Sequence, residues 1–235
     1  MKKALIIGSG FTGCMFAMML NQKGWDVKIF DKSKLTGGGV RTFYHGGHPY
    51  TYGPRHFIGP EENMKAFEFL NKIVPMRHIK KMNVSYQQNE DLFASYPMHI
   101  EDVKKFKDSK KIFDELDNLP KESKSKNFEE FWIGRVGKTL YERFNKFYNL
   151  KAWQIDSNKE MDFGFEATVK RKPLETKSRY EFPEGYINAY PKPADGYNKF
   201  FDVSLSGCNT ILNCTIESVD LDKRKLITDK GDFEG

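Results

Sequence analysis

A glycine pattern between two apolar segments constrains this chain more tightly than any other feature of its sequence. The apolar run Lys3–Ile7 ends at Gly8, as a buried parallel strand does. The letters GSGFTG occupy 8–13, and residues 14–23 then have the composition of a buried helix. The run Asp26–Phe30 is typical of a second strand. This order predicts a β-α-β unit, so we expect an α/β fold.

The spacing G-x-G-x-x-G indicates a dinucleotide-binding turn when a strand precedes it and a helix follows. Gly8 permits the tight turn, Gly10 lets backbone N–H groups approach a pyrophosphate, and Gly13 lets the helix pack closely on the strand. The helix N-terminus favours phosphate charge, and Asp31 after the second strand can accept a hydrogen bond from a ribose hydroxyl. A glycine turn without a nucleotide is the alternative. The expected contacts are Gly8, Gly10, Phe11, Thr12, Gly13, Asp31 and Lys32.

A second glycine cluster, Gly37, Gly38 and Gly39, favours FAD over NAD as the dinucleotide. Bare backbone at this place can approach the pyrophosphate and the flavin. A domain that binds only NAD usually continues into another β-α-β unit, whereas residues 36–60 are rich in glycine and proline. The alternative for the cluster is a flexible loop.

Composition excludes several other classes of protein. Hydrophobic residues make up 39% and charged residues 30%, as in folded chains. The longest apolar run, residues 14–20, is shorter than the roughly 20 residues of a membrane span, and no signal-peptide cleavage site follows the apolar start. Three cysteines with no metal-like spacing suit a reducing compartment. We therefore expect a soluble, cytoplasmic protein.

The formal net charge of +6 suits nucleic acid, an acidic membrane or a small anionic ligand. Half of the excess lies at residues 104–126, where acidic residues alternate with the lysines, as on a solvated helix face. His45, His48 and His56 lie close together, but no carboxylate or cysteine joins them at metal-ligand spacing. We expect no metal, and a small anion rather than nucleic acid.

The remaining pattern predicts three domains. They are an incomplete FAD-binding Rossmann-like domain at 1–75 and 200–235, a β-sheet substrate domain at 76–100 and 163–199, and a helical substrate domain at 101–162. The finer expectations are helices at 61–74, 138–150 and 196–205, strands at 84–97 around a turn at 89–91, a turn at 134–137, one strand at 211–220 and a hairpin at 225–233. Because a hairpin comes last, we expect this chain to be the front part of a longer protein.

Aromatic residues form a stripe on the helix expected at 138–150. Tyr141, Phe144 and Tyr148 stand at positions i, i+3 and i+7, which share one helix face, and Trp153 follows. Such a stripe is more often buried core than a ligand platform. Leu140 and Phe147 can supply the buried face instead, and tyrosine favours half-exposed positions. Both interpretations stay open on the pattern alone.

Several of these blocks resemble the UDP-galactopyranose mutase family. The segments Val-Gly-Lys-Thr-Leu-Tyr at 136–141 and Tyr-x-x-Lys-x-Trp at 148–153 match family motifs without gaps. The glycine pair 37–38 and Tyr-Gly-Pro-Arg-His-Phe at 52–57 correspond to further blocks. The resemblance implies an FAD-binding domain with inserted substrate domains. It also implies that Phe144, Tyr148, Trp153, Arg171 and Tyr190 bind a UDP-sugar and that Ile216 contacts the adenine of FAD.

The departures from the family fall where catalysis and substrate choice are decided. Arg41 ends the segment that reads Gly-Gly-Asn-Ala-Tyr in the family, and Arg55 and His56 replace or displace its Ala-His. Glu175 stands where the family has an arginine that binds the substrate pyrophosphate. We take Arg41, Arg55 and His56 as the candidate catalytic residues that adjust the flavin.

The expected function is an FAD-dependent isomerase that interconverts UDP-galactopyranose and UDP-galactofuranose, or contracts the ring of a related UDP-sugar. No side-chain nucleophile with a positioned base is visible, so the cofactor must carry the difficult step. The resemblance implies reduced flavin as the nucleophile and a role in polysaccharide biosynthesis. The expected partner is a UDP-sugar, without nucleic acid or a membrane span, and the chain is a candidate homodimer. An FAD-dependent oxidoreductase of the amine-oxidase type is the main alternative, and a basic binding module without flavin is the third.

Overall fold

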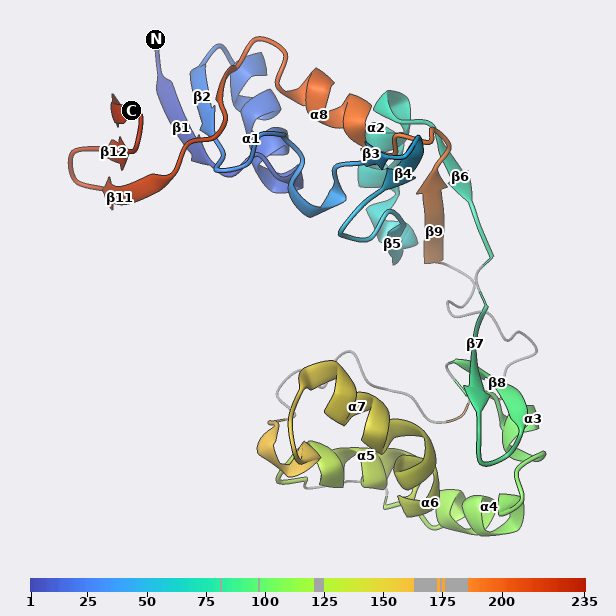
Figure 1. Cartoon of the computed structure of the whole chain (residues 1–235). Coiled ribbons are helices and arrows are strands. Elements are labelled where there is room, and N and C mark those ends of the chain that lie inside the picture. The colour runs from blue at the N-terminus through green and yellow to red at the C-terminus, as the bar shows by residue number, and fades with distance from the viewer. Residues whose placement is uncertain (81, 97, 121–124, 163–172, 174, 176–185) are drawn as a thin grey trace. The chain divides into compact units, whose positions relative to one another are not determined.

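The computed structural model describes residues 1–235 apart from 81, 97, 121–124, 163–172, 174 and 176–185 (Figure 1). The chain forms two compact units. Unit 1 contains Met1–Ile79 and Glu184–Gly235, and unit 2 contains Lys80–Pro183. The first and last parts of the sequence therefore build one unit together, and the middle of the chain builds the other.

The centre of unit 1 is the predicted β-α-β unit. Strands β1 (Lys3–Ile7) and β2 (Asp26–Phe30) pair in parallel, and β10 (Asn209–Ile211) adds to the other side of β2. Helix α1 (Phe11–Gln22) connects β1 to β2 and begins three residues earlier than the apolar pattern predicts. Its buried Ala17 packs with Val27 and Ile29 of β2. Apolar side chains facing between helix and sheet supply the stabilisation of this element.

A second sheet completes unit 1. Strands β5 (Phe57–Pro60) and β6 (Met76–His78) pair antiparallel with the two sides of β9 (Tyr186–Pro191). Helices α2 (Met64–Ile73) and α8 (Asn198–Ser204) pack against each other, and α8 also packs against α1 (Figure 1). The shared core comprises Cys14, Phe67, Leu70, Val74, Met76, Ile187, Ala189, Tyr197, Phe200 and Phe201.

The smaller elements of unit 1 are a two-stranded hairpin and a three-stranded antiparallel sheet. Strands β3 (Phe43–His45) and β4 (His48–Tyr50) form a hairpin after a 3-10 turn at Gly38–Val40. A second 3-10 turn, Glu61–Asn63, precedes α2. Strands β11 (Ile216–Asp220), β12 (Lys225–Thr228) and β13 (Gly231–Glu234) form an antiparallel sheet, so the predicted hairpin near residue 230 is confirmed.

Unit 2 combines one hairpin with a group of helices. Strands β7 (Asn83–Gln87) and β8 (Leu92–Tyr96) pair around the predicted turn at 89–91. The helices are α3 (Ile100–Val103), α4 (Ser109–Asp117), α5 (Phe128–Val136), α6 (Lys138–Leu140) and α7 (Lys146–Trp153), with a π-helical segment at Tyr141–Asn145 and a 3-10 turn at Asn158–Glu160. Their core includes Ile112, Phe128, Phe131, Trp132, Leu140 and Tyr141.

Three of the finer sequence predictions were wrong. The strand expected at 211–220 is two strands, because β10 joins the parallel sheet and β11 pairs with β12. The turn expected at 134–137 lies within α5 until Gly137, which has a φ of 80° and ends the helix. The helix expected at 138–150 contains the π-helical segment and continues to Trp153.

The division into compact units also differs from the three expected domains. Residues 76–79 and 186–199, which we expected in a β-sheet substrate domain, belong to unit 1, and the β7–β8 hairpin forms a separate sheet in unit 2. Residues 163–172 and 176–185 of that expected domain lie outside the described part of the chain. Among the described residues, no helix is long and apolar enough to cross a membrane.

Candidate functional site

The glycine turn after β1 requires glycine at two of its positions. Gly8 has a φ of 91°, in the left-handed region, and its N–H donates to the carbonyl oxygen of Phe30 at 2.7 Å. A Cβ on Gly13 would lie 1.9 Å from the carbonyl oxygen of Gly8. A side chain at position 13 would therefore push α1 away from the turn. The roles that the sequence assigns to Gly8 and Gly13 fit this geometry.

Gly10 has a different surrounding. Its φ of −69° suits any residue, and a Cβ built on it meets no atom within 4 Å. Gly10 is also the N-cap of α1, and no side chain caps this helix end. The first N–H groups of a helix attract anions when no side chain satisfies them. The space in front of Gly10 therefore fits a pyrophosphate group that approaches the backbone.

The second glycine cluster lies directly against the first turn. The N–H of Gly37 donates to the carbonyl oxygen of Ser9 at 2.7 Å. A Cβ on Gly37 would lie 2.6 Å from the ring of Phe201, and one on Gly38 would lie 3.4 Å from the Cα of Gly10. Both glycines have positive φ. The two clusters thus present adjacent bare backbone, as an extended dinucleotide requires.

Asp31 is held by the glycine turn itself. Its Oδ2 accepts hydrogen bonds from the N–H of Ser9 at 2.7 Å and from the Ser9 hydroxyl at 2.6 Å, and its Oδ1 accepts one from the N–H of Ser33 at 2.8 Å. Partial burial raises the pKa of this carboxyl, but the hydrogen bonds from Ser9 and Ser33 together outweigh it and hold the pKa below its ordinary value. Asp31 is therefore an ionised acceptor at neutral pH. Sequence reasoning missed Ser9, because glycine spacing says nothing of the residue between the glycines.

A cavity of about 720 Å³ borders the second glycine cluster. Its lining residues are Ser33, Lys34, Leu35, Gly38, Gly39, Arg41, Phe43, Tyr44 and Tyr52. Arg41 contacts Asp202 at 3.3 Å and Thr36 at 3.4 Å through Nη1, so its positive charge stays at the cavity wall. Lys32, next to Asp31, is exposed. The residues present fit a dinucleotide such as FAD. Gly38 and Gly39 offer bare backbone and Lys34 and Arg41 offer positive charge at this cavity, and the ionised Asp31 accepts a hydrogen bond from Ser33 in its wall.

Arg55 and His56 do not join Arg41 at this cavity. Arg55 Nη2 donates to the carbonyl oxygen of Ala194 at 2.6 Å, so its guanidinium binds the loop that follows β9. The ring of His56 stacks on Tyr190 with centroids 5.3 Å apart, and His56 lines a separate, mostly apolar cavity of about 550 Å³ together with Phe11. The structure therefore separates the three expected catalytic residues, and their roles stay predictions.

Two further residues of unit 1 were expected at ligands. Ile216 packs on Phe30 and Cys214 in a small core beneath the last sheet, and its contact with an adenine stays a prediction. Tyr190, expected at the substrate, lies in β9 of unit 1.

Burial raises the pKa of the Cys14 thiol to about 12, so this cysteine is not a nucleophile at neutral pH.

Unit 2 contains the aromatic residues expected at a uridine. Phe144 and Tyr148 line one cavity of about 580 Å³. The ring of Phe144 stacks on Tyr96 with centroids 5.9 Å apart, whereas Tyr148 is 67% exposed. The other lining residues are Asn83, Val84, Ser85, Gln87, Tyr96, Trp132, Arg143, Asn145, Phe147 and Asn149. Polar side chains of β7 and of the 141–149 segment therefore line the cavity together with five aromatic side chains, as in a site for a flat polar ligand.

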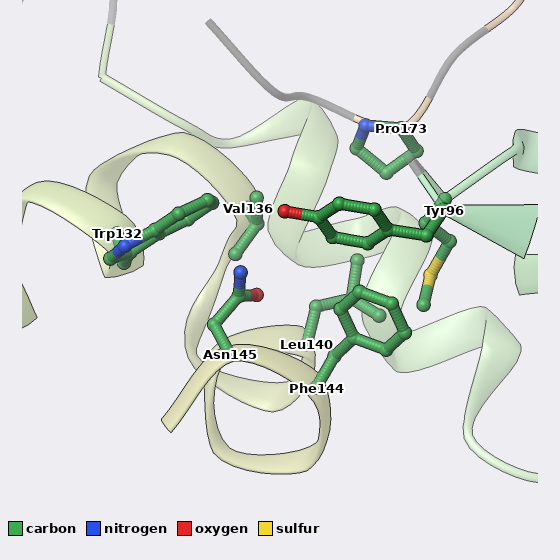
Figure 2. Close-up of a pocket in the computed structure, with 8 residues that line it drawn as sticks. Tyr96, Trp132, Val136, Leu140, Phe144, Asn145 and Pro173 are labelled. Carbon is green, nitrogen blue, oxygen red and sulfur yellow. The ribbon is translucent and has the colours of Figure 1, made fainter. Parts of the chain in front are cut away.

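Two polar atoms of residues that line this cavity have no hydrogen-bond partner among the residues that the structure describes. Trp132 and Asn149 are each 5% exposed, and neither Trp132 Nε1 nor Asn149 Nδ2 has a hydrogen-bond partner in the described part of the chain. Buried donors are normally paired, so unpaired ones beside a cavity are consistent with a ligand that accepts hydrogen bonds there. Figure 2 shows Trp132 with Tyr96, Phe144 and Asn145 at the neighbouring recess.

The π-helical segment decides which aromatic residues come together. Tyr141 is buried, and its hydroxyl donates to Glu129 at 3.0 Å and accepts from Asn158 at 2.9 Å. It therefore does not share the cavity with Phe144 and Tyr148, contrary to the spacing argument, because a π-helical turn contains more than 3.6 residues. Phe147, expected to be buried, is 67% exposed. The predicted burial of Leu140 is confirmed.

The remaining expected substrate residues are not brought to this cavity by the described structure. Trp153 is 55% exposed at the end of α7 and is not among the lining residues. Arg171 lies outside the described residues, and Glu175 is exposed. Within the described ranges, no group of three His, Cys, Asp or Glu side chains could hold a metal ion.

The fold and the glycine turn define unit 1 as a Rossmann-like, dinucleotide-binding domain. Residues 6–73 match the model of a family described as "NAD(P)-binding Rossmann-like domain". The chain is 27% identical over 198 residues to a protein of Klebsiella pneumoniae named "Probable UDP-galactopyranose mutase", and the match covers 80% of this chain and 48% of that one. It is 28% identical over 228 residues to the "dTDP-fucopyranose mutase" of Escherichia coli, with 89% and 55% covered.

A solved structure agrees with these relatives on the fold. The crystal structure of a reduced UDP-galactopyranose mutase matches 99% of this chain and 53% of its own chain, with a TM-score of 0.76 and 19% identity. A "1-hydroxycarotenoid 3,4-desaturase" of Flavobacterium sp. (strain P99-3) is 33% identical over only 92 residues, or 39% of this chain. The chain spans about half the length of the mutases it matches. The expected resemblance to the N-terminal part of UDP-galactopyranose mutases is confirmed, and the same findings support FAD as the cofactor.

Proposed function

We propose that this chain provides the FAD site and part of the substrate site of a UDP-sugar mutase that interconverts pyranose and furanose rings. The observation that carries the proposal is the cavity of unit 2. There Phe144 and Tyr148 meet amide side chains and buried donors that have no partner among the described residues. This cavity occurs in a chain whose other unit suits a dinucleotide. A flavin protein with a second, aromatic nucleotide site is what a sugar-nucleotide mutase needs.

The residues of unit 1 would hold FAD as follows. The N-terminus of α1 and the backbone at Gly10 and Gly38 would bind the pyrophosphate, and Asp31 would accept a ribose hydroxyl through Oδ1. Reduced FAD would supply nucleophilic chemistry at the anomeric carbon of the sugar. Arg41 keeps a fixed positive charge at the cavity wall, so it is the best placed of the three expected catalytic residues to favour an anionic flavin.

The residues of unit 2 would bind the nucleotide. The uracil would stack between Phe144 and Tyr148, with Trp153 near the ribose or phosphate. A cation such as Arg171 would meet the pyrophosphate and compensate for Glu175, which adds a negative charge where the family has a positive one. Tyr190 stays a proposed substrate residue of unit 1. The cytoplasmic setting, the homodimer and the role in polysaccharide biosynthesis also stay predictions.

An anaerobic assay tests the reaction. The protein would be incubated with UDP-galactose and related UDP-sugars, with oxidised flavin or with flavin reduced by dithionite. A mutase converts sugar only with reduced flavin and consumes no reductant in proportion to product. Equal turnover with oxidised flavin, or one product per reductant consumed, would contradict the proposal.

An FAD-dependent oxidoreductase is the second candidate, and the likeness to a carotenoid desaturase favours it. That likeness covers a much smaller share of this chain than the likeness to the mutases does. An oxidoreductase also gives no role to the paired aromatic and amide side chains of unit 2. Stoichiometric consumption of an electron acceptor without a change of ring size would support this alternative.

A further inference from the structure

A small recess adjoins the proposed nucleotide cavity of unit 2. It has a volume of about 20 Å³ and is lined by Tyr96, Met98, Trp132, Val136, Leu140, Phe144, Asn145 and Pro173 (Figure 2). Met98, Val136 and Leu140 are buried hydrophobic side chains, and Phe144 and Pro173 add apolar surface. A space of about 10–15 Å³ holds one water-sized group. The recess therefore has the size of a single methyl group and the chemistry to attract one.

The recess and the cavity share four of their lining residues. These are Tyr96, Trp132, Phe144 and Asn145. Figure 2 shows the ring of Tyr96 between Pro173 and Phe144, with Trp132, Val136 and Asn145 around its hydroxyl end. A flat base lying against Phe144 in the cavity would have one edge at these shared residues. That edge would reach the recess.

The shared residues also specify which atoms of a base belong at this edge. Trp132 lines both spaces, and its Nε1 is a donor without a partner in the described part of the chain. A donor beside an apolar recess matches a ring with a carbonyl oxygen next to a methyl-bearing carbon. Thymine has this arrangement at O4 and C5. Uracil has the carbonyl but leaves the recess empty, and cytosine presents a donor where Trp132 also presents one.

We propose, on the basis of the mutase function above, that the base pocket of unit 2 takes the 5-methyl group of thymine into this recess. The reaction stays the same, and thymidine diphosphate sugars become the preferred substrate class. Burial of one methyl group makes binding about fourfold tighter, the equivalent of ~0.8 kcal/mol at 1.4 kcal/mol per tenfold. UDP-sugars then bind the same site more weakly.

Calorimetry with four nucleotides isolates the methyl group from the sugar. UDP, 5-methyl-UDP, dUDP and dTDP would be titrated into the wild-type protein. The expected result is a fourfold gain from the methyl group in both the ribose and the deoxyribose pair. A ratio of one, or weaker binding of the methylated members, would overturn the inference while UDP binding still supported the mutase. Absence of binding by all four would refute the nucleotide site itself.

Two further measurements locate the methyl group. Val136→Ile adds a carbon to the recess wall, so the ratio of the dTDP and dUDP affinities should fall towards one. A ratio that stays at fourfold in this variant would place the methyl group elsewhere and overturn the inference. The wild-type protein gives an independent check with 5-ethyl-dUDP. Its larger substituent exceeds the recess, so it should bind more weakly than dTDP, and equal or tighter binding would count against the recess.

Discussion

Gly10→Ala separates cofactor binding from folding. Gly10 already has a φ of −69° and a ψ of −176°, and a Cβ built there meets no atom within 4 Å. The folded protein therefore has room for alanine. The gain of about 0.4–1 kcal/mol from a less flexible unfolded chain is offset by a cost of roughly the same size for alanine at a helix N-cap, so the stability should change little. The added carbon occupies the space proposed for the FAD pyrophosphate. It would displace a charged acceptor from at least one backbone donor, a loss of ~1.5–3 kcal/mol, or roughly tenfold to hundredfold in affinity.

The assay for this prediction is titration of the apoprotein with FAD, followed by flavin fluorescence, beside thermal unfolding of the apoprotein. Gly13→Ala is the matched control, because its Cβ would lie 1.9 Å from the backbone oxygen of Gly8. Alanine there should lower the melting temperature before any ligand is added. If Gly10→Ala binds FAD as tightly as the wild type, the pyrophosphate does not lie at Gly10. If Gly10→Ala unfolds the apoprotein, the space in front of Gly10 is not open as described.

Three more outcomes follow from the geometry. The pKa of Asp31 is held below its ordinary value, so its stabilisation is present above about pH 4 and is lost as the pH falls further. Asp31→Asn should therefore lower the melting temperature at neutral pH, with a difference that narrows in acid. Tyr148→Ala should weaken UDP binding roughly tenfold in calorimetry, whereas Phe93→Ala, at an equally exposed ring outside the cavity, should not. Arg143→Met removes the cation that pairs with Glu90 and Asp108. The buried Glu90 carboxylate then keeps only the backbone N–H of Lys107, so the change should cost about 2–4 kcal/mol in urea unfolding, which a second change, Glu90→Gln, partly restores.

Each of these outcomes has a result that contradicts it. A melting difference for Asp31→Asn that is constant from neutral to acidic pH would mean that the charge of Asp31 is irrelevant to stability. Equal UDP affinities for Tyr148→Ala and the wild type would remove Tyr148 from the base site. A double variant no more stable than Arg143→Met alone would show that the uncompensated charge of Glu90 is not the cause of the loss.

Local patterns in the sequence predicted the part of the fold that local patterns control. The bounds of β1 and β2 agree residue for residue, because each strand is a short, largely apolar run that ends at a glycine or an aspartate. The strand expected at 211–220 failed because the same apolar run serves two sheets. The chain changes partner near Cys214, whose N–H donates to the carbonyl oxygen of Asp31. No periodicity marks such a change.

The candidate sites show the same limit. Gly8, Gly10 and Gly13 could be found from spacing, since a turn is a local structure. The hydrogen bonds of Ser9 to Asp31 and the meeting of Ser85 with Tyr148 at one cavity depend on tertiary packing. The heptad-like spacing of Tyr141 and Tyr148 predicted one shared helix face. This prediction was wrong because a π-helical turn changes the helical phase between them. A sequence pattern carries no signal for that phase change.

The pairing of β9 with β6 has a consequence for the order of events during synthesis. Residue 77 lies opposite residue 190, and residue 28 opposite residue 209, so unit 1 cannot close until the ribosome has made the whole of unit 2. Until then, the edge of β2 that later pairs with β10 and the edge of β6 that later pairs with β9 stay unpaired. Exposed strand edges of this kind are surfaces that chaperones bind. The contacts of unit 2 all lie between residues 80 and 183, so it can form first. Slow translation between residues 184 and 211 would thus prolong the exposure of the nascent nucleotide-binding sheet.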